Sequence, residues 1–127
     1  MPSRASERPG WLRKQRWLAN GYDGQASSLF RLNRFAEAAE VRRRSIEIRE
    51  RIRERLGADW TARENTHLAG IYFALADTLS RAGEATEASE AATVAVNIWN
   101  EISLLHPDLF TLDIRNSFER AKQLRIG

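Results

Sequence analysis

Two similar stretches, fifty residues apart, constrain the fold of this chain more than any other feature of its sequence. The first reads LFRLNRFAEAAEVRRRSIEI from Leu29 to Ile48, and the second reads LSRAGEATEASEAATVAVNI from Leu79 to Ile98. The same offset pairs Tyr22 with Tyr72, Ile52 with Ile102, and Trp60-Thr61 with Phe110-Thr111. Similarity at a fixed period is typical of arrays in which each unit buries its apolar face against a neighbour. We therefore interpret the chain as two copies of one structural unit.

The composition of both copies favours α-helix. Ala, Leu, Arg and Glu are abundant, whereas Gly and Pro are sparse and stand at boundaries. No segment alternates polar and apolar residues over the length of a strand. The expected helices span residues 11–31, 35–56, 61–81, 85–105 and 111–124. Thr61 and Glu64 have the spacing of a capping box, and Asn33 and Gly83 stand at equivalent turns that favour a left-handed backbone.

The length and composition indicate one cysteine-free domain. A chain of 127 residues fits a single domain, which we place at residues 11–127 behind a disordered tail at 1–10. The absence of cysteine excludes disulfides and thiolate metal sites. The first ten residues lack the apolar centre of a secretory signal, and the longest apolar run, at 71–76, is too short to cross a bilayer. We expect a cytoplasmic protein that does not enter a membrane.

Charge is distributed unevenly along the chain. Residues 1–63 contain 15 Lys and Arg against 8 Asp and Glu, whereas residues 64–127 contain 5 against 9. This asymmetry would allow head-to-tail self-association or binding of an acidic partner at the N-terminal half. Because 18 of the 20 basic residues are arginine and alanine is abundant, we also expect a bacterial source with a GC-rich genome.

The order of large and small residues in the second copy is distinctive. An aromatic residue, a leucine–small pair and another large residue precede a turn, and two small residues seven positions apart follow it. These positions are Tyr72, Leu75-Ala76, Leu79, Ala88 and Ala95, and their counterparts in the first copy are Tyr22, Gln25-Ala26, Leu29, Ala38 and Ser45. The pattern resembles the tetratricopeptide repeat (TPR) family, from which the first copy departs at Gln25, where the family has leucine.

The period also departs from that family, whose usual repeat is about 34 residues long. Here both helices of each copy are longer, and the HPD sequence at 106–108 resembles the long-helix versions that are common in large bacterial signalling proteins. The resemblance implies an all-α helical-hairpin solenoid. Its two TPR-like repeats of about 50 residues would span 18–60 and 68–110, followed by a C-terminal capping helix at 111–127.

The resemblance implies a function as well. TPR arrays hold protein or peptide partners in a concave groove lined by the first helix of each repeat, so we expect a non-catalytic scaffold or adaptor that can also self-associate through an open end. The implied groove residues are Asp23, Ser27, Phe30, Arg31, Phe73, Asp77 and Arg81. The family's carboxylate clamp uses lysine and asparagine, whereas aspartates in this groove would repel the terminal carboxylate of a peptide.

An arginine-rich stretch at residues 41–57, VRRRSIEIRERIRERLG, leaves a second interpretation open. It is either a solvated helix face or a basic surface for nucleic acid, for which Arg42, Arg43 and Arg44 are the candidate residues. The interleaved glutamates would repel phosphate. Nucleic acid is therefore the alternative partner, after protein.

An enzymatic interpretation depends on His67 and Glu64, which are three residues apart on one expected helix. A Glu–His pair could serve acid–base chemistry, but no residue nearby completes a site. The sequence contains no His-Glu-x-x-His, no Gly-rich phosphate loop and no Gly-x-Ser-x-Gly. We therefore expect no catalytic residue, no cofactor and no metal.

Overall fold

The protein is all-helical in the computed structural model, which describes residues 9–126. The helices are α1 (Pro9–Arg31), α2 (Phe35–Leu56), α3 (Ala62–Arg81), α4 (Ala85–Leu105) and α5 (Leu112–Ile126), with single 3₁₀ turns η2 (Gly57–Asp59) and η3 (Pro107–Leu109). The described residues contain no β-strand, so the expected all-α class is confirmed. Across residues 9–126, no helix is both long and apolar enough to cross a membrane.

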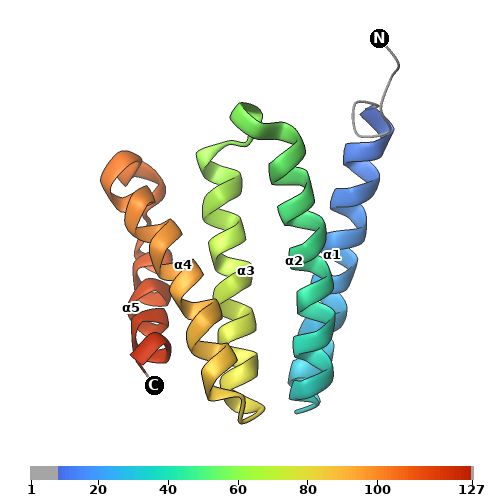
Figure 1. Ribbon diagram of the computed structural model, residues 1–127, viewed down its shortest axis with the longest axis vertical. Helices are drawn as coiled ribbons and strands as arrows, with labels where there is room; N and C mark the ends of the chain where they lie inside the picture. The colour runs from blue at the N-terminus through green and yellow to red at the C-terminus, as the bar shows by residue number, and fades with distance from the viewer. Residues whose placement is uncertain (1–8, 127) are drawn as a thin grey trace.

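The helices pack as hairpins, α1 against α2 and α3 against α4, and α5 packs against α4. Figure 1 shows α2 and α3 side by side in the middle, with α1 behind α2 and α5 behind α4. Both hairpin turns are short because one residue in each adopts a left-handed backbone, Asn33 with φ 60° and Gly83 with φ 82°. The expectation for these two turns is confirmed.

The helix boundaries follow from local capping. The backbone N–H of Glu64 donates to the Thr61 hydroxyl at 3.1 Å, and the backbone N–H of Thr61 donates to the Glu64 carboxylate at 3.2 Å. The predicted capping box at the start of α3 is therefore present. The first helix begins earlier than expected, at Pro9, because proline is well suited to a first helical turn. Of the tail expected at 1–10, residues 1–8 lie outside the described residues, and Pro9 and Gly10 are helical.

The core contains two clusters whose members stand fifty residues apart. Ala19, Ile48 and Ile52 form the first, and Tyr22 and Trp60 pack against it. The second contains Ala69, Ile98 and Ile102, and Tyr72 and Phe110 pack against it. Corresponding positions of the two hairpins are thus filled by the same or similar residues.

A third cluster joins the two hairpins. Ala39 and Ile46 of α2 pack there with Ile71, Leu75 and Leu79 of α3. Alanines at 38, 88 and 95 are buried where neighbouring helices approach one another, as the alternation of small and large residues predicted. The two hairpins therefore share part of their core through this cluster.

Candidate functional site

Four of the expected groove residues join with one further residue in a continuous row across α1, α3 and α5. The Arg81 guanidinium lies over the Phe30 ring, 5.1 Å from its centroid, and Arg81 Nε lies 3.4 Å from Asp77 Oδ1. Arg120 Nη2 lies 3.7 Å from the same carboxylate oxygen, and its guanidinium lies 5.3 Å from the Phe73 ring centroid. We call Phe30, Arg81, Asp77, Arg120 and Phe73 the arginine–aromatic row. Arg120 is the member that sequence reasoning missed.

The other three expected groove residues take no part in the contacts of this row. Arg31 is exposed and donates a hydrogen bond to Ser28, and Ser27 is half-buried. Asp23 pairs with arginines of α2, so its carboxylate serves the contact between α1 and α2. Its expected role as a groove-lining group open to a partner is therefore not supported by its position.

The Asp23 carboxylate lies between two buried arginines of α2. Arg49 Nη2 donates to Asp23 Oδ2 at 2.6 Å and to Asn20 Oδ1 at 2.9 Å, while Arg49 Nε donates to Ser45 Oγ at 3.2 Å. Arg42 Nη1 lies 3.6 Å from Asp23 Oδ1. The side chains of Arg42 and Arg49 are each 9% exposed. Burial lowers the pKa of Arg42, and the charge of Asp23 opposes that shift.

A cavity of about 460 Å³ opens beside this network, between the middle of α1, the second half of α2 and the start of α3. Its walls include Arg16, Asn20, Arg49, Trp60, Arg63 and His67. We call it the cationic cavity, because three arginines line it and its one acidic residue, Glu64, is paired with Arg16.

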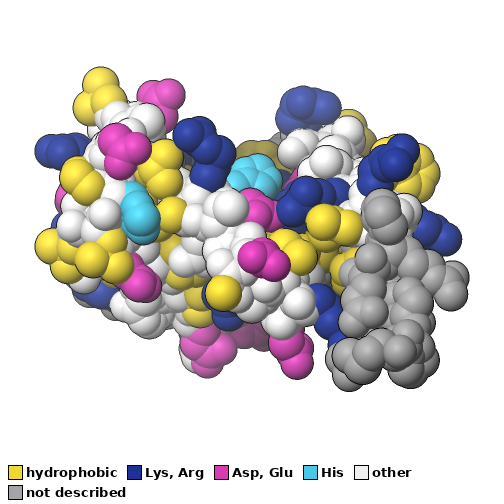
Figure 2. Space-filling model, turned by 90° about the horizontal axis from the view of Figure 1, so that it is seen from above, with side chains coloured by type: hydrophobic (Ala, Val, Ile, Leu, Met, Phe, Trp, Pro, Cys, Tyr) yellow, Lys and Arg dark blue, Asp and Glu magenta, His cyan; other side chains and the backbone are white. Residues whose placement is uncertain are grey.

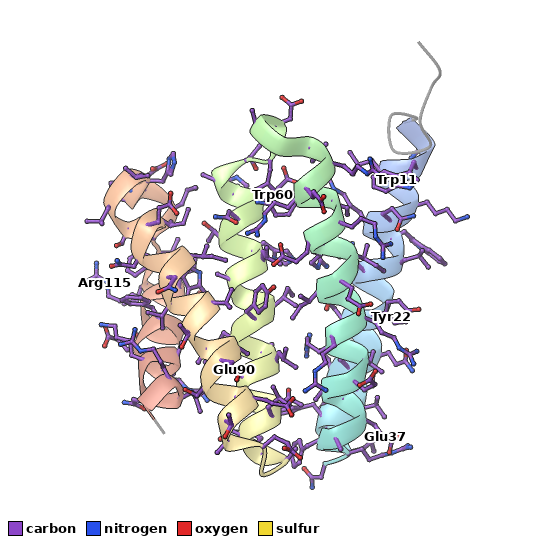
Figure 3. The ribbon with its side chains drawn as sticks, in the orientation of Figure 1. Trp11, Tyr22, Glu37, Trp60, Glu90 and Arg115 are labelled. Carbon is purple, nitrogen blue, oxygen red and sulfur yellow. The ribbon has the colours of Figure 1, made fainter. Side chains whose placement is uncertain are left out.

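The cationic cavity lies toward the end of the molecule where α3 begins. Figure 3 places Trp60 at that end, between α2 and α3. Figure 2 looks down on the same end and shows Lys and Arg side chains around a hollow beside a histidine. The indole of Trp60 is held in place because its Nε1 donates to Asn65 Oδ1 at 3.2 Å.

A second cavity, of about 500 Å³, lies between α3, α4 and α5 and corresponds to the first at an offset of fifty residues. Gly70, Trp99, Asp113 and Ser117 line it where the cationic cavity has Asn20, Arg49, Arg63 and His67. Asp108 adds a second carboxylate to this cavity. Arg63 and His67 line both cavities. The two corresponding hollows therefore differ in charge: the first has three arginines and one carboxylate, and the second has one arginine, two carboxylates and a buried indole.

The arginines at 42–44 do not form one exposed basic surface. Arg42 is buried beside Asp23, which corrects its assignment to a solvated face or a nucleic-acid surface. Arg43 is half-buried and forms ion pairs with Glu40 and Glu87. Arg44 alone of the three is fully exposed.

Glu64 and His67, the residues of the enzymatic interpretation, do not form a catalytic pair. The Glu64 carboxylate caps α3 and pairs with Arg16, and no hydrogen bond joins it to His67. Burial lowers the pKa of His67, and the charge of Arg49 lowers it further. Within the described part of the chain, no three His, Asp or Glu side chains are grouped so that they could hold a metal ion.

Comparisons with known proteins returned no match. No protein-family model, no curated protein and no solved structure matches this chain.

Proposed function

We propose that this chain is a two-repeat helical-hairpin solenoid of the TPR type, with α5 as its cap, that acts as a non-catalytic protein-binding scaffold or adaptor. The core supports this proposal, because residues fifty positions apart occupy corresponding clusters in the two hairpins. A solenoid of stacked hairpins explains that correspondence, since each unit repeats the contacts of the last. The resemblance of both copies to TPR sequences supports the same conclusion.

The arginine–aromatic row is the observation on which the binding function depends. It crosses the odd-numbered helices α1, α3 and α5, which would line the concave groove of such a solenoid. The side chains of Arg81 and Arg120 are 50% and 57% exposed, so each presents charge above an aromatic face. Arginine and aromatic residues together are typical of residues that dominate protein interfaces. A partner segment with acidic and apolar side chains fits this surface best.

Affinity purification from cells of the source organism tests the proposal, followed by binding measurements with the purified partner. Arg81→Glu should abolish capture or weaken binding about tenfold or more, because reversal of one central charge places like charges together. Arg44→Glu makes the same change of charge on an exposed residue outside the row, and it should leave binding intact. Equal binding by both variants would remove the row from the proposed interface.

Self-association is part of the proposal. Leu104, Leu105 and Leu112 are 74%, 64% and 72% exposed, and they stand at the end of α4 and the start of α5. Large exposed apolar residues are candidates for association surfaces. Sedimentation velocity should show a concentration-dependent dimer that Leu112→Glu disrupts. A chain that stays monomeric at high concentration would contradict self-association and leave the scaffold proposal in place.

A further inference from the structure

We propose that the cationic cavity is a binding site for a small organic anion, in which a phosphate or carboxylate group is attached to a flat apolar ring. The proposal concerns the open hollow between α1, α2 and α3, and it does not depend on the protein-binding function.

The cavity and its wall contain more positive than negative charge. Three guanidiniums, those of Arg16, Arg49 and Arg63, line the cavity with one carboxylate, that of Glu64. Arg42 and Asp23 belong to the network of Arg49 next to the cavity. Glu64 is paired with Arg16, and Asp23 is shared between Arg42 and Arg49. Arg63 forms no ion pair with any residue of the described range 9–126. Arg49 shares its carboxylate with Arg42, and Arg63 has none among the described residues, so an anion in the cavity would supply a further negative charge to these guanidiniums.

The fold itself does not require these charged residues. At an offset of fifty residues, Trp99 stands in place of Arg49, Phe73 in place of Asp23, and Ala92 in place of Arg42. The rings of Phe73 and Trp99 pack with their centroids 6.0 Å apart, so the second hairpin is held at the same place by apolar contacts. Ion pairs in a protein interior are generally no more stabilising than apolar residues of similar size. The charged version in the first hairpin is therefore better explained by a ligand than by stability.

The groups that remain free define the ligand. Arg49 uses Nε and Nη2 for its hydrogen bonds to Ser45, Asn20 and Asp23, and none of those bonds uses Nη1. A guanidinium fixed in this way is preorganised for an oxyanion, since its orientation is set before binding. Trp60 and Ile52 supply an apolar wall beside it. The volume of about 460 Å³ lies in the range of small-molecule sites.

Phenyl phosphate, benzoate, inorganic phosphate and benzylamine serve as the probes, and NMR of the whole chain follows the His67 ring and the Trp60 indole. Phenyl phosphate or benzoate should give saturable shifts of both NMR signals. Whichever of these two probes binds more tightly shows whether the cavity prefers a phosphate or a carboxylate. Inorganic phosphate should bind more weakly because it lacks the ring, and benzylamine should give no saturable shift because its charge is positive.

Two arginine variants make the experiment specific for the cavity. Arg63 lines the cavity and is exposed, so Arg63→Gln should preserve the fold and weaken phenyl phosphate or benzoate binding about tenfold, the usual effect of losing one charged hydrogen bond. Arg44→Gln removes the same charge outside the cavity and should leave affinity unchanged. The proposal is overturned if neither aromatic anion gives a saturable shift at millimolar concentration, or if both variants bind like the original chain.

Discussion

Arg49 of α2 and Trp99 of α4 occupy corresponding positions fifty residues apart, and both residues are buried, with whole-residue exposed fractions of 8% and 2%. Arg49 is held by the Asp23 carboxylate of α1, whereas Trp99 packs on the Phe73 ring of α3. The same place in two similar hairpins thus contains an ion pair in one and an aromatic pair in the other. This difference predicts that the two hairpins respond differently to loss of charge.

Removal of the Asp23 carboxylate should strongly destabilise the protein. In Asp23→Asn, two buried guanidiniums lose their shared counter-charge, and we expect the free energy of unfolding to fall by about 3–5 kcal/mol. Arg49→Met should cost much less, because Asp23 keeps Arg42 as a partner and methionine can fill the space. Urea denaturation followed by circular dichroism measures both changes. A larger loss in Arg49→Met than in Asp23→Asn would contradict this account of the network.

Asp77 offers a matched control, because its carboxylate also lies between two arginines, Arg81 and Arg120. Both of those side chains are half or more exposed, so solvent screens the charges. Asp77→Asn should therefore change the free energy of unfolding by about 1 kcal/mol or less. A similar loss in Asp77→Asn and Asp23→Asn would show that burial is not what makes the Asp23 network important.

Ile52 and Ile102 provide a test of the correspondence between the hairpins. Each is 2% exposed and each belongs to the cluster of its own hairpin, beside Ile48 or Ile98. Ile52→Ala and Ile102→Ala should each lower the free energy of unfolding by about 2–5 kcal/mol, because each leaves a cavity of similar size. Denaturant unfolding of the two variants gives the comparison. If one substitution is nearly neutral, the two clusters are not equivalent.

The two hairpin turns should respond in opposite directions to substitution. Gly83→Ala should cost about 1 kcal/mol, because an alanine at φ 82° is strained. Asn33→Gly should be neutral or slightly stabilising, because its φ of 60° suits glycine without strain. Thermal unfolding of both variants measures the effects. A stabilising Gly83→Ala would show that this turn does not depend on its left-handed residue.

Much of the fold could be predicted from the sequence because helix propensity, caps and apolar spacing act locally. Thr61 with Glu64 identifies the start of α3, and Asn33 and Gly83 mark the turns. The pairing of residues fifty positions apart also anticipated the two similar core clusters. These signals involve short-range contacts or apolar side chains, whose burial depends little on their exact partners.

The cationic cavity could not be predicted in the same way. A charged residue on an amphipathic helix ordinarily indicates a solvated face. The sequence therefore did not predict that Arg42 and Arg49 are buried, because their burial depends on the Asp23 carboxylate of α1, which only the structure places beside them. The sequence contained one sign of this network, because Arg49 in the first copy corresponds to Trp99 in the second at the offset of fifty residues. An arginine that replaces a core tryptophan is a reason to look for a carboxylate at the corresponding place of the facing helix, where Asp23 replaces Phe73.

His67 should make the stability of the protein depend on pH. His67 is exposed on one side, but partial burial and the charge of Arg49 lower its pKa below the ordinary value of 6.5, while Asp23 opposes the shift. Between the lowered pKa and 6.5, the unfolded chain binds a proton that the folded chain does not, so stability falls with acidification in that window. From about pH 7.5 to about pH 5, the melting temperature should therefore fall further in the original chain than in His67→Gln. Equal losses in the two proteins would show that His67 does not couple folding to protons.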